Sequence, residues 1–417
     1  MTVASSRPVR RRNAKLWTVG AGVVAALTVG GLALTALTGS NQPTQSPSSA
    51  PVVIAPSSGG TRVQDNGGVP AGYSRTEAGA KAAASNYATV SGSSSFLTDK
   101  AVRHRAIRGM TSARTAAAAI AESGRSADPS LKHRAVARTG VLAAHVLGFD
   151  IHKATVRLWT TTVRGSAVGG TAPQLAFRSV TVGLVWERGD WKVSGSTSGP
   201  GLVAPVDVQQ TVSVAGDFAD YIAGEAVDPL VSGAVGADGF PAPYPRTAAG
   251  SRAAATSAVQ LYGDPRFFTN TSWRHRMLAA TASPDTLASV RADADSTARL
   301  VVDNRGLGAD GKTSDGSALV TRTAVLGVRP VSYSEQAASV EVWTASVGGI
   351  AGDDETQRPR IAFLRMTVDL VWSGGSWRTT AVTPGEPLVP SFSATEAASA
   401  AERFAEVGGV GDAPATA

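Results

Sequence analysis

Two stretches of the chain carry the same hairpin signature: Val180-Thr-Val-Gly-Leu-Val-Trp186 followed by Trp191-Lys192, and Met366-Thr-Val-Asp-Leu-Val-Trp372 followed by Trp377-Arg378. In both stretches, β-branched and large apolar residues alternate with other residues, a period of two that predicts a β-strand. The segments Glu187–Asp190 and Ser373–Ser376 lie between the paired tryptophans and predict tight hairpin turns. The chain therefore contains the same strand–turn–strand unit twice.

The similarity between the two halves extends well beyond this hairpin. A motif of the form Y-x-R-T-x-A-G-x-x-A-A begins at Tyr73 and recurs at Tyr244, an offset of 171 residues, and the same offset places Arg103-His104-Arg105 on Arg274-His275-Arg276. Further along the chain, Trp159 corresponds to Trp343 and Phe218 to Phe404. A period near 180 residues indicates a duplicated domain rather than a solenoid repeat.

Each copy is predicted to contain two helices, four strands and a final helix. In the first copy the predicted helices are Thr76–Val90, with Thr76 as N-cap, and Asp99–Glu122, and the predicted strands are Thr139–Val146, Thr155–Val163, Arg178–Glu187 and Trp191–Gly195. Val208–Ile222 and its counterpart Ala394–Val407 are predicted as amphipathic helices. Consecutive strands with short turns pair antiparallel, so we expect an α+β fold with helices on one face of each sheet and water on the other.

The start of the chain combines cations with a long apolar segment. Five cations precede Leu16 with no acidic residue among them: Arg7, Arg10, Arg11, Arg12 and Lys15. The 22 residues Leu16–Leu37 are apolar apart from small Thr and Gly. As a helix they span about 33 Å, enough to cross a hydrocarbon core of about 30 Å. We therefore predict an uncleaved, single-pass anchor with its N-terminus in the cytoplasm, and a cleaved signal peptide is the alternative.

Charge and composition limit the classes of function. The chain has a net charge of +7, but the part that remains without the five N-terminal cations has only +2. The basic bias belongs to the membrane flank, so we expect no direct, sequence-specific binding of nucleic acid. The chain has no Cys, so an exported domain must fold by packing alone.

The composition also divides the chain into segments. We expect a basic cytoplasmic stub at 1–15, a transmembrane anchor at 16–38, a disordered Pro/Ser-rich linker at 39–70, a first module at 71–225, a short linker at 226–243, a second module at 244–410 and a disordered tail at 411–417. Pro, Ser, Gln, Thr and Gly dominate the linker at 39–70, which has too few large apolar residues to form a core.

A cytoplasmic stub, one membrane helix and two tandem α+β modules resemble the VirB8 and TcpC-type scaffold proteins of conjugative transfer systems. The motifs that carry the resemblance are Y-x-R-T-x-A-G-x-x-A-A and V-T-V-x-L-V-W with the following W-K/R, and they recur over Tyr73 to Gly409. The resemblance implies NTF2-like modules, in which helices pack on a curved antiparallel sheet. It transfers no functional residue to a numbered position here. The Ala-, Gly- and Arg-rich composition also resembles actinobacterial proteins, where such components occur on mobile elements.

One loop matches a nucleotide-binding pattern by its letters. Gly306–Thr313 reads G-x-x-x-x-G-K-T, a pattern that binds phosphate only between a strand and a helix. Leu300-Val-Val could supply the strand, but the residues after Thr313 predict another turn and then a strand. The same loop carries Asp303, Asp310 and Asp315, whose spacing fits no EF-hand. We interpret it as a surface loop, and Asp353-Asp354-Glu355 as a solvated acidic turn.

No other residue set predicts catalysis or a metal. The five histidines are His104, His133, His145, His152 and His275, and none of them pairs with another at the i, i+4 spacing of a helical zinc site. Neither G-x-S-x-G nor S-x-x-K is present. The repeated tryptophans, Trp159/Trp343, Trp186/Trp372 and Trp191/Trp377, are interpreted as packing residues, with a ligand platform as the alternative. We therefore predict no catalytic, cofactor-binding or metal-binding residues.

These observations favour a non-enzymatic, membrane-anchored assembly component of a conjugative, type IV secretion-like apparatus. Its modules are expected outside the membrane, where they contact other transfer proteins, while the N-terminal helix contacts the lipid bilayer. The glycines of the anchor allow close helix–helix approach, so formation of a homo-oligomer stays open. The alternative is a cell-envelope protein that binds a lipid or wall fragment in a sheet cavity.

Overall fold

The computed structural model describes residues 71–126, 135–167, 172–210, 215–221, 243–392 and 396–407, together with Val69 and Phe240. The predicted stub, membrane segment and almost all of the first linker lie outside the described residues, as do most of the second linker and the C-terminal tail. Among the residues that are described, no helix is long and apolar enough to cross a bilayer.

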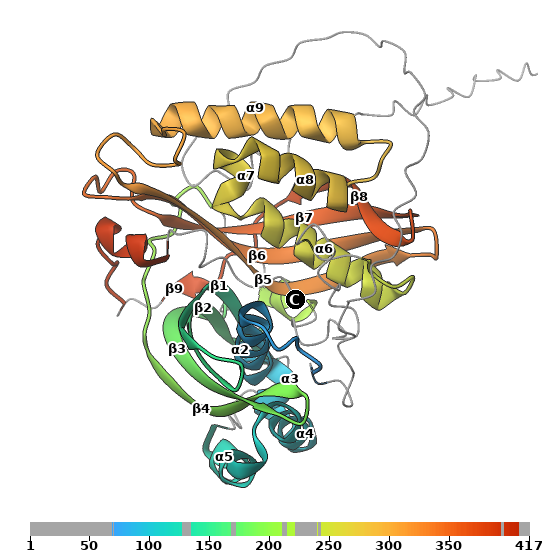
Figure 1. Ribbon diagram of the computed structural model, residues 1–417, viewed down its shortest axis with the longest axis vertical. Coiled ribbons are helices and arrows are strands. Elements are labelled where there is room, and N and C mark those ends of the chain that lie inside the picture. Colours follow the sequence, from blue (N-terminus) through green and yellow to red (C-terminus); the bar gives the residue numbers. More distant parts are fainter. Residues whose placement is uncertain are drawn as a thin grey trace, which may run out of the picture.

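Each half of the chain folds into helices followed by a four-stranded sheet (Figure 1). The elements of the first module are α2 (Glu77–Ser91), α3 (Ser94–Thr98), α4 (Lys100–Met110), α5 (Ala113–Ser126), β1 (Ala135–Phe149), β2 (Lys153–Ser166), β3 (Gln174–Glu187) and β4 (Asp190–Pro200). Those of the second module are α6 (Ala248–Tyr262), α7 (Pro265–Thr269), α8 (Thr271–Thr281), α9 (Leu287–Arg305), β5 (Ala318–Tyr333), β6 (Ala337–Ala351), β7 (Arg360–Ser373) and β8 (Ser376–Gly385).

The two sheets have the same topology. Their strand orders are β1-β2-β3-β4 and β5-β6-β7-β8, with every neighbouring pair antiparallel. Glu187 pairs with Asp190 and Ser373 with Ser376, which confirms the two predicted hairpin turns. Both sheets are strongly curved, and their helices lie on one face (Figure 1). The α+β class predicted from the sequence is confirmed.

Local signals predicted the first helix of each module well. The side chain of Thr76 accepts a hydrogen bond from the amide of Gly79, and Thr247 accepts one from Gly250, so both threonines act as N-caps. The prediction of one helix over Asp99–Glu122 is wrong. The helix breaks at Thr111 and Ser112, because the amide of Ser112 donates to the carbonyl of Val193 and ties the chain to the edge strand β4.

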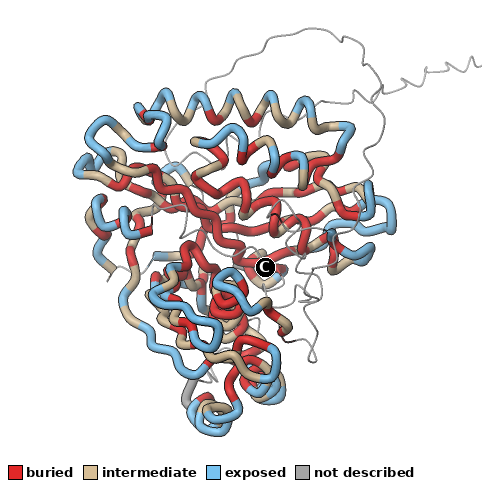
Figure 2. Tube along the Cα trace, viewed as in Figure 1, coloured by how far each residue is buried: buried red, intermediate tan, exposed pale blue. Residues whose placement is uncertain are grey.

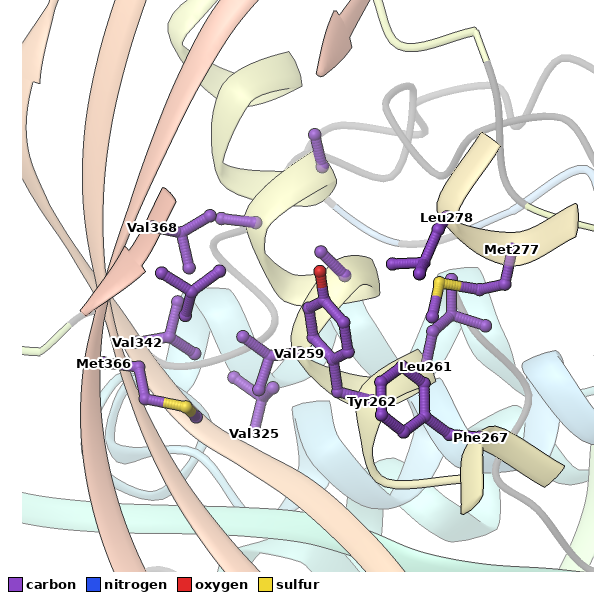
Figure 3. Close-up of a cluster of buried hydrophobic side chains, with 14 of the residues drawn as sticks. Val259, Leu261, Tyr262, Phe267, Met277, Leu278, Val325, Val342, Met366 and Val368 are labelled. Carbon is purple, nitrogen blue, oxygen red and sulfur yellow. The ribbon is translucent and has the colours of Figure 1, made fainter. Parts of the chain in front are cut away.

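Side chains fill the space between the helices and the sheet of the second module. Figure 3 shows Val259 and Tyr262 of α6 facing Val325, Val342 and Val368 of the sheet. Met277 and Leu278 of α8 extend the same buried cluster on the other side of α6. Burial of this apolar surface is the main stabilising contribution within the module.

The opposite faces of the two sheets pack against each other rather than facing water. The helices α4 and α5 lie at one end of the molecule and α7, α8 and α9 at the other, with both sheets between them (Figure 1). Buried residues concentrate where the sheets meet (Figure 2). This intermodule core, which we call the seam, contains Val136, Leu142, Trp159, Phe177, Val320, Leu326, Trp343 and Phe363. The expectation of one solvated face per sheet is therefore wrong, since the second module covers the face that the first would expose.

The chain after each sheet crosses the seam to the other module. The first tail (201–210 and 215–221) places Val206 beside Ile361 of β7, and the second tail (386–392 and 396–407) places Phe392 beside Leu175 of β3. The carbonyl of Pro205 accepts from the amide of Ile361 at 2.8 Å, and the carbonyl of Pro173 accepts from Ser391 at 2.8 Å. The exchange is reciprocal, so neither module is complete without the other.

Aromatic rings and arginines hold the tails in the seam. Phe218 of the first tail packs edge-on against Trp343 of the second module at 5.4 Å between ring centroids, and Phe404 of the second tail packs against Trp159 of the first at 5.6 Å. The buried Arg322 guanidinium donates to the carbonyl of Val407 at 2.7 Å. In the first module, Arg138 donates likewise to the carbonyl of Tyr221.

The tails are not the amphipathic helices predicted over Val208–Ile222 and Ala394–Val407. Their described helical parts are short 3-10 turns, η2 (Ala215–Ala219) and η5 (Ala401–Val407). Val208 is 87% exposed, whereas an apolar position of such a helix would be buried. The backbone of each tail first pairs with a strand of the other module, at Val206 and in β9 (Ser391–Phe392), just before the predicted helix begins. Phe218 and Phe404 then pack across the seam against Trp343 and Trp159.

Candidate functional site

A basic pocket opens at the free end of the first module. It has a volume of about 750 Å³ and lies between the chain that enters α2, helix α4 and the β3–β4 turn. Its cationic side chains, which define what we call the cationic cleft, are Arg75, Arg105, Arg108, Arg188 and Lys192. Three separate segments contribute them, so only the folded module brings these charges together.

Arg75 is held at the rim of the cleft by three contacts. Its Nε donates to the carbonyl of Ile151 at 2.7 Å, and its Nη2 lies 2.8 Å from Nδ1 of His152. The guanidinium stacks over the Trp186 ring at 5.3 Å, a cation–π contact. Trp186 in turn packs edge-on against the buried Trp191 at 5.3 Å. The position of this cation is therefore fixed by the hairpins beside it.

Asp190 supplies the one carboxylate among the described residues that line the cleft, and its oxygens are occupied. Its Oδ1 accepts from the amides of Tyr73 and Trp191, both at 2.9 Å. Its Oδ2 lies 2.8 Å from Nζ of Lys192, which also donates to the carbonyl of Gly109 at 2.6 Å. Asp190 ties β4 to the start of the module and Lys192 ties it to α4, and the cleft keeps an excess of positive charge.

Arg188 occupies a strained position at the tip of the β3–β4 turn. Its φ of 55° is the left-handed conformation, which costs a residue with a side chain roughly 1–2 kcal/mol. Among the described residues it is the one non-glycine with positive φ. Its side chain is exposed and its Nε lies 3.8 Å from Glu187, whose carboxylate also accepts from the amide of Ala113. A turn of this kind favours Asn or Gly at this position, so the chain carries a cation there at a cost in backbone strain.

The second module reproduces this charge only in part, since Arg246, Arg276 and Arg378 correspond to Arg75, Arg105 and Lys192. The counterpart of Arg188 is Gly374, which has a φ of 60°, and the counterpart of Arg108 is Ala279. The framework around them is retained, since Arg246 stacks over Trp372 at 5.6 Å as Arg75 does over Trp186. The sequence carries a signal for the site in these unmatched positions of an otherwise similar repeat, but sequence reasoning did not single them out.

The loop that matches a nucleotide-binding pattern has the wrong surroundings for that role. Leu300-Val-Val, considered as a strand, lies inside α9, and Gly306 ends this helix at a φ of 60°. The strand β5 follows the loop, so neither the preceding strand nor the following helix of a phosphate loop is present there. Asp310 accepts from the amide of Lys312 at 3.0 Å, as the residues of a tight turn do. The loop has the geometry of the predicted surface turn.

The acidic residues and histidines are dispersed over the described part of the chain, which contains no group of three that could hold a metal ion. Asp315 is engaged by Thr313 and Ser317 within its own turn. His275 lies 2.9 Å from a carboxylate oxygen of Asp295 in α9, whereas its repeat partner His104 is flanked by cations. Partial burial of the imidazole is the largest cause that lowers the pKa of His104, and the nearby cations Lys100, Arg108 and Arg103 lower it further. His133 lies outside the described residues.

The repeated tryptophans are packing residues, with one exception at the cleft. Trp159 and Trp343 lie in the seam and donate from Nε1 to the carbonyls of Leu202 and Leu388, at 2.8 and 2.9 Å. Trp191 and Trp377 are buried and donate to the carbonyls of Ser74 and Pro245, both at 2.9 Å. Trp186 instead lines the cationic cleft.

Comparisons with known proteins extend to part of the chain. A protein-family model, described as a domain of unknown function (DUF8175), matches residues 35–219. The chain is similar to the intermembrane space region of the chloroplast protein ARC6, at 17% identity and a TM-score of 0.22, over 32% of this chain and 95% of that chain. It is also similar to an Ntf2-like protein involved in plasmid conjugation, at 9% identity and a TM-score of 0.20, over 74% and 98% of the two chains. The search of curated proteins finds no match.

Proposed function

We propose that this protein is a non-enzymatic assembly component of a conjugative transfer apparatus. Segment 16–38 anchors it in the cell membrane, and its two NTF2-like modules lie outside the membrane and bind other transfer proteins. The assignment to conjugation comes from the resemblance of the repeated motifs to VirB8 and TcpC-type scaffolds. The observation that carries the scaffold role is the seam, which joins the two modules through shared aromatic packing and exchanged tails.

A seam of this kind favours a structural role for a physical reason. Because both tails cross between modules, the relative position of the two helical faces is set by buried contacts rather than by a hinge. The faces point in opposite directions (Figure 1) and differ in sequence. A single chain can therefore hold two different partners at a fixed separation, which suits a component that bridges an assembly.

Affinity purification from the native host in mild detergent tests the proposal. The tagged full chain should recover other transfer proteins. Phe404→Ala, which removes a buried ring from the seam, should reduce recovery of partners that contact both modules. Phe392→Ala is the matched control, since Phe392 lies in the same tail but is 45% exposed. Recovery of no transfer protein by the wild-type chain, under conditions that keep it folded, would contradict the proposal.

The alternative function is binding of a lipid or wall fragment. The space between α6 and its sheet does not favour binding of such a ligand, because buried side chains fill it (Figure 3). The cationic cleft does favour a ligand, but at the free end of the first module and not in the interior of a sheet.

A further inference from the structure

An exposed apolar loop borders the cationic cleft. Three large apolar side chains at the β1–β2 turn face solvent: Leu147 at 49% exposure, Phe149 at 37% and Ile151 at 54%. We call these three residues the apolar loop. Large apolar residues that gather on a surface mark a site of interaction rather than ordinary surface composition.

The apolar loop and the cleft are one structural unit. The carbonyl of Ile151 accepts from Arg75, and the carbonyl of His152 accepts from the amide of Trp186 at 2.8 Å. The ring of Phe149 lies 5.9 Å from that of Trp191, beneath the β3–β4 turn that carries Arg188. These contacts place five cations and three exposed apolar side chains at the same end of the module.

We propose that this end of the first module docks on an anionic bilayer surface. The cationic cleft binds the phosphate of a phospholipid headgroup, and the apolar loop enters the interfacial layer beside it. This inference rests on the membrane anchoring in the proposed function. Residues 39–70 separate the predicted anchor from Ala71, which itself lines the cleft. The chain that leaves the membrane therefore enters the folded part at the docking surface.

The chemistry of the surface matches a phosphodiester headgroup. Arginine presents planar pairs of N–H donors that fit two phosphate oxygens, and four of the five cations are arginines. Each basic side chain near an anionic bilayer contributes about 1 kcal/mol, which corresponds to a change of about fivefold in affinity. Apolar side chains that enter the interface add to this attraction.

The second module reproduces only part of the surface. Val331 and Tyr333 are exposed as Leu147 and Phe149 are, and Arg246, Arg276 and Arg378 stand at three of the five cationic positions. The residue that corresponds to Ile151 is Glu335, whose carbonyl accepts from Arg246 as that of Ile151 does from Arg75. An anionic side chain at this position is repelled by an anionic membrane. Gly374 replaces the strained Arg188 on the neighbouring turn. The difference between the modules gives the proposal an internal control within one chain.

The absence of Cys in the chain permits a specific test. Ile151→Cys carries an environment-sensitive dye on the full chain in proteoliposomes, and Glu335→Cys carries the same dye at the matched position. Vesicles of phosphatidylcholine alone are compared with vesicles that contain phosphatidylglycerol. We expect a blue shift of the dye at position 151 in the anionic vesicles and none at position 335.

Two further variants test the role of the cleft. Arg108→Ala and Arg188→Gly copy the second module, so both should fold, and each should lower the response to phosphatidylglycerol by about fivefold at limiting anionic lipid. Soluble glycerol phosphate is added as a separate arm. The same shift with glycerol phosphate alone would mean that the cleft binds a soluble phosphate rather than a bilayer, and it would overturn the proposal. Equal shifts at positions 151 and 335, or no dependence on the anionic lipid, would also overturn it.

Flotation of the vesicles separates this inference from the proposed function. A chain that floats with phosphatidylcholine vesicles but shows no anionic shift is anchored and does not dock, so only the inference fails. A chain that does not float with phosphatidylcholine lacks the anchor, and the proposed membrane location then fails together with the inference that rests on it.

Discussion

Replacing Phe404 by alanine should destabilise the first module as well as the second, although Phe404 belongs to the second tail. The ring of Phe404 is fully buried and packs edge-on against Trp159 of β2 at 5.6 Å. Removal of a buried phenylalanine ring costs about 3–5 kcal/mol, a range that includes the cavity left behind. The aromatic contact accounts for about 0.5–1.5 kcal/mol of it. We expect a loss of about 4 kcal/mol in the free energy of unfolding.

Urea unfolding of the full chain in detergent micelles measures this loss. Tryptophan fluorescence and far-ultraviolet circular dichroism should report one shared transition, because the seam is common to both modules. Hydrogen exchange should rise at the amides of β2 in the first module. Phe392→Ala is the control and should change the free energy by no more than about 0.5 kcal/mol, since its side chain is 45% exposed.

Two results would refute this reasoning. Unfolding of the wild-type chain in two separate transitions would mean that the modules are independent and that the seam does not couple them. Faster hydrogen exchange confined to the second module in Phe404→Ala would mean that the second tail stabilises only the module to which it belongs in sequence.

Three other perturbations have expected outcomes. Arg188→Gly should raise the unfolding free energy by about 1 kcal/mol in a thermal melt, because glycine relieves the left-handed strain, and a loss of stability would contradict the strain. Gly140→Val should cost about 1–3 kcal/mol, since a Cβ there lies 2.8 Å from that of Ala324 across the seam, while Gly148→Ala meets nothing within 4 Å and should be neutral. Burial alone would raise the pKa of Asp295, but hydrogen bonds from its cationic neighbours outweigh burial and lower the pKa. The wild-type chain should therefore have a higher free energy of unfolding than Asp295→Asn, and this difference should be complete above pH 3.8 and disappear as the pH falls further. Thermal melts recorded from pH 6 to 2 measure the difference.

The elements predicted correctly are those whose determinants are local. Thr76 and Thr247 each cap a helix through an amide three residues ahead, so a few neighbouring residues suffice to predict the helix start. The hairpin turns likewise depend on residues between two adjacent strands. The break at Thr111 escaped prediction because its cause is the carbonyl of Val193, more than eighty residues away.

The candidate site was predictable only in part. Arg108 and Arg188 are visible in the sequence as positions where the two repeats differ, against Ala279 and Gly374. Their proximity is not visible, since α4 and the β3–β4 turn come together only when Lys192 and Asp190 tie the turn to α4. The excess of positive charge in the cleft depends on where the folded chain places these side chains. Composition alone attributes the basic bias to the N-terminal flank.

The sequence by itself determined the duplication, the α+β class, the hairpins and the helix caps, because repeated letters and short-range periodicity encode them. The tertiary structure decided where the tails lie and which faces of the sheets are shielded from solvent. The pattern of apolar residues in the tails predicts helices, yet Phe218 and Phe404 pack against Trp343 and Trp159 of the opposite module. Periodicity predicts that a residue will be buried, but the residue that covers it lies about 125 to 245 positions away in the sequence, and only the folded chain specifies that partner.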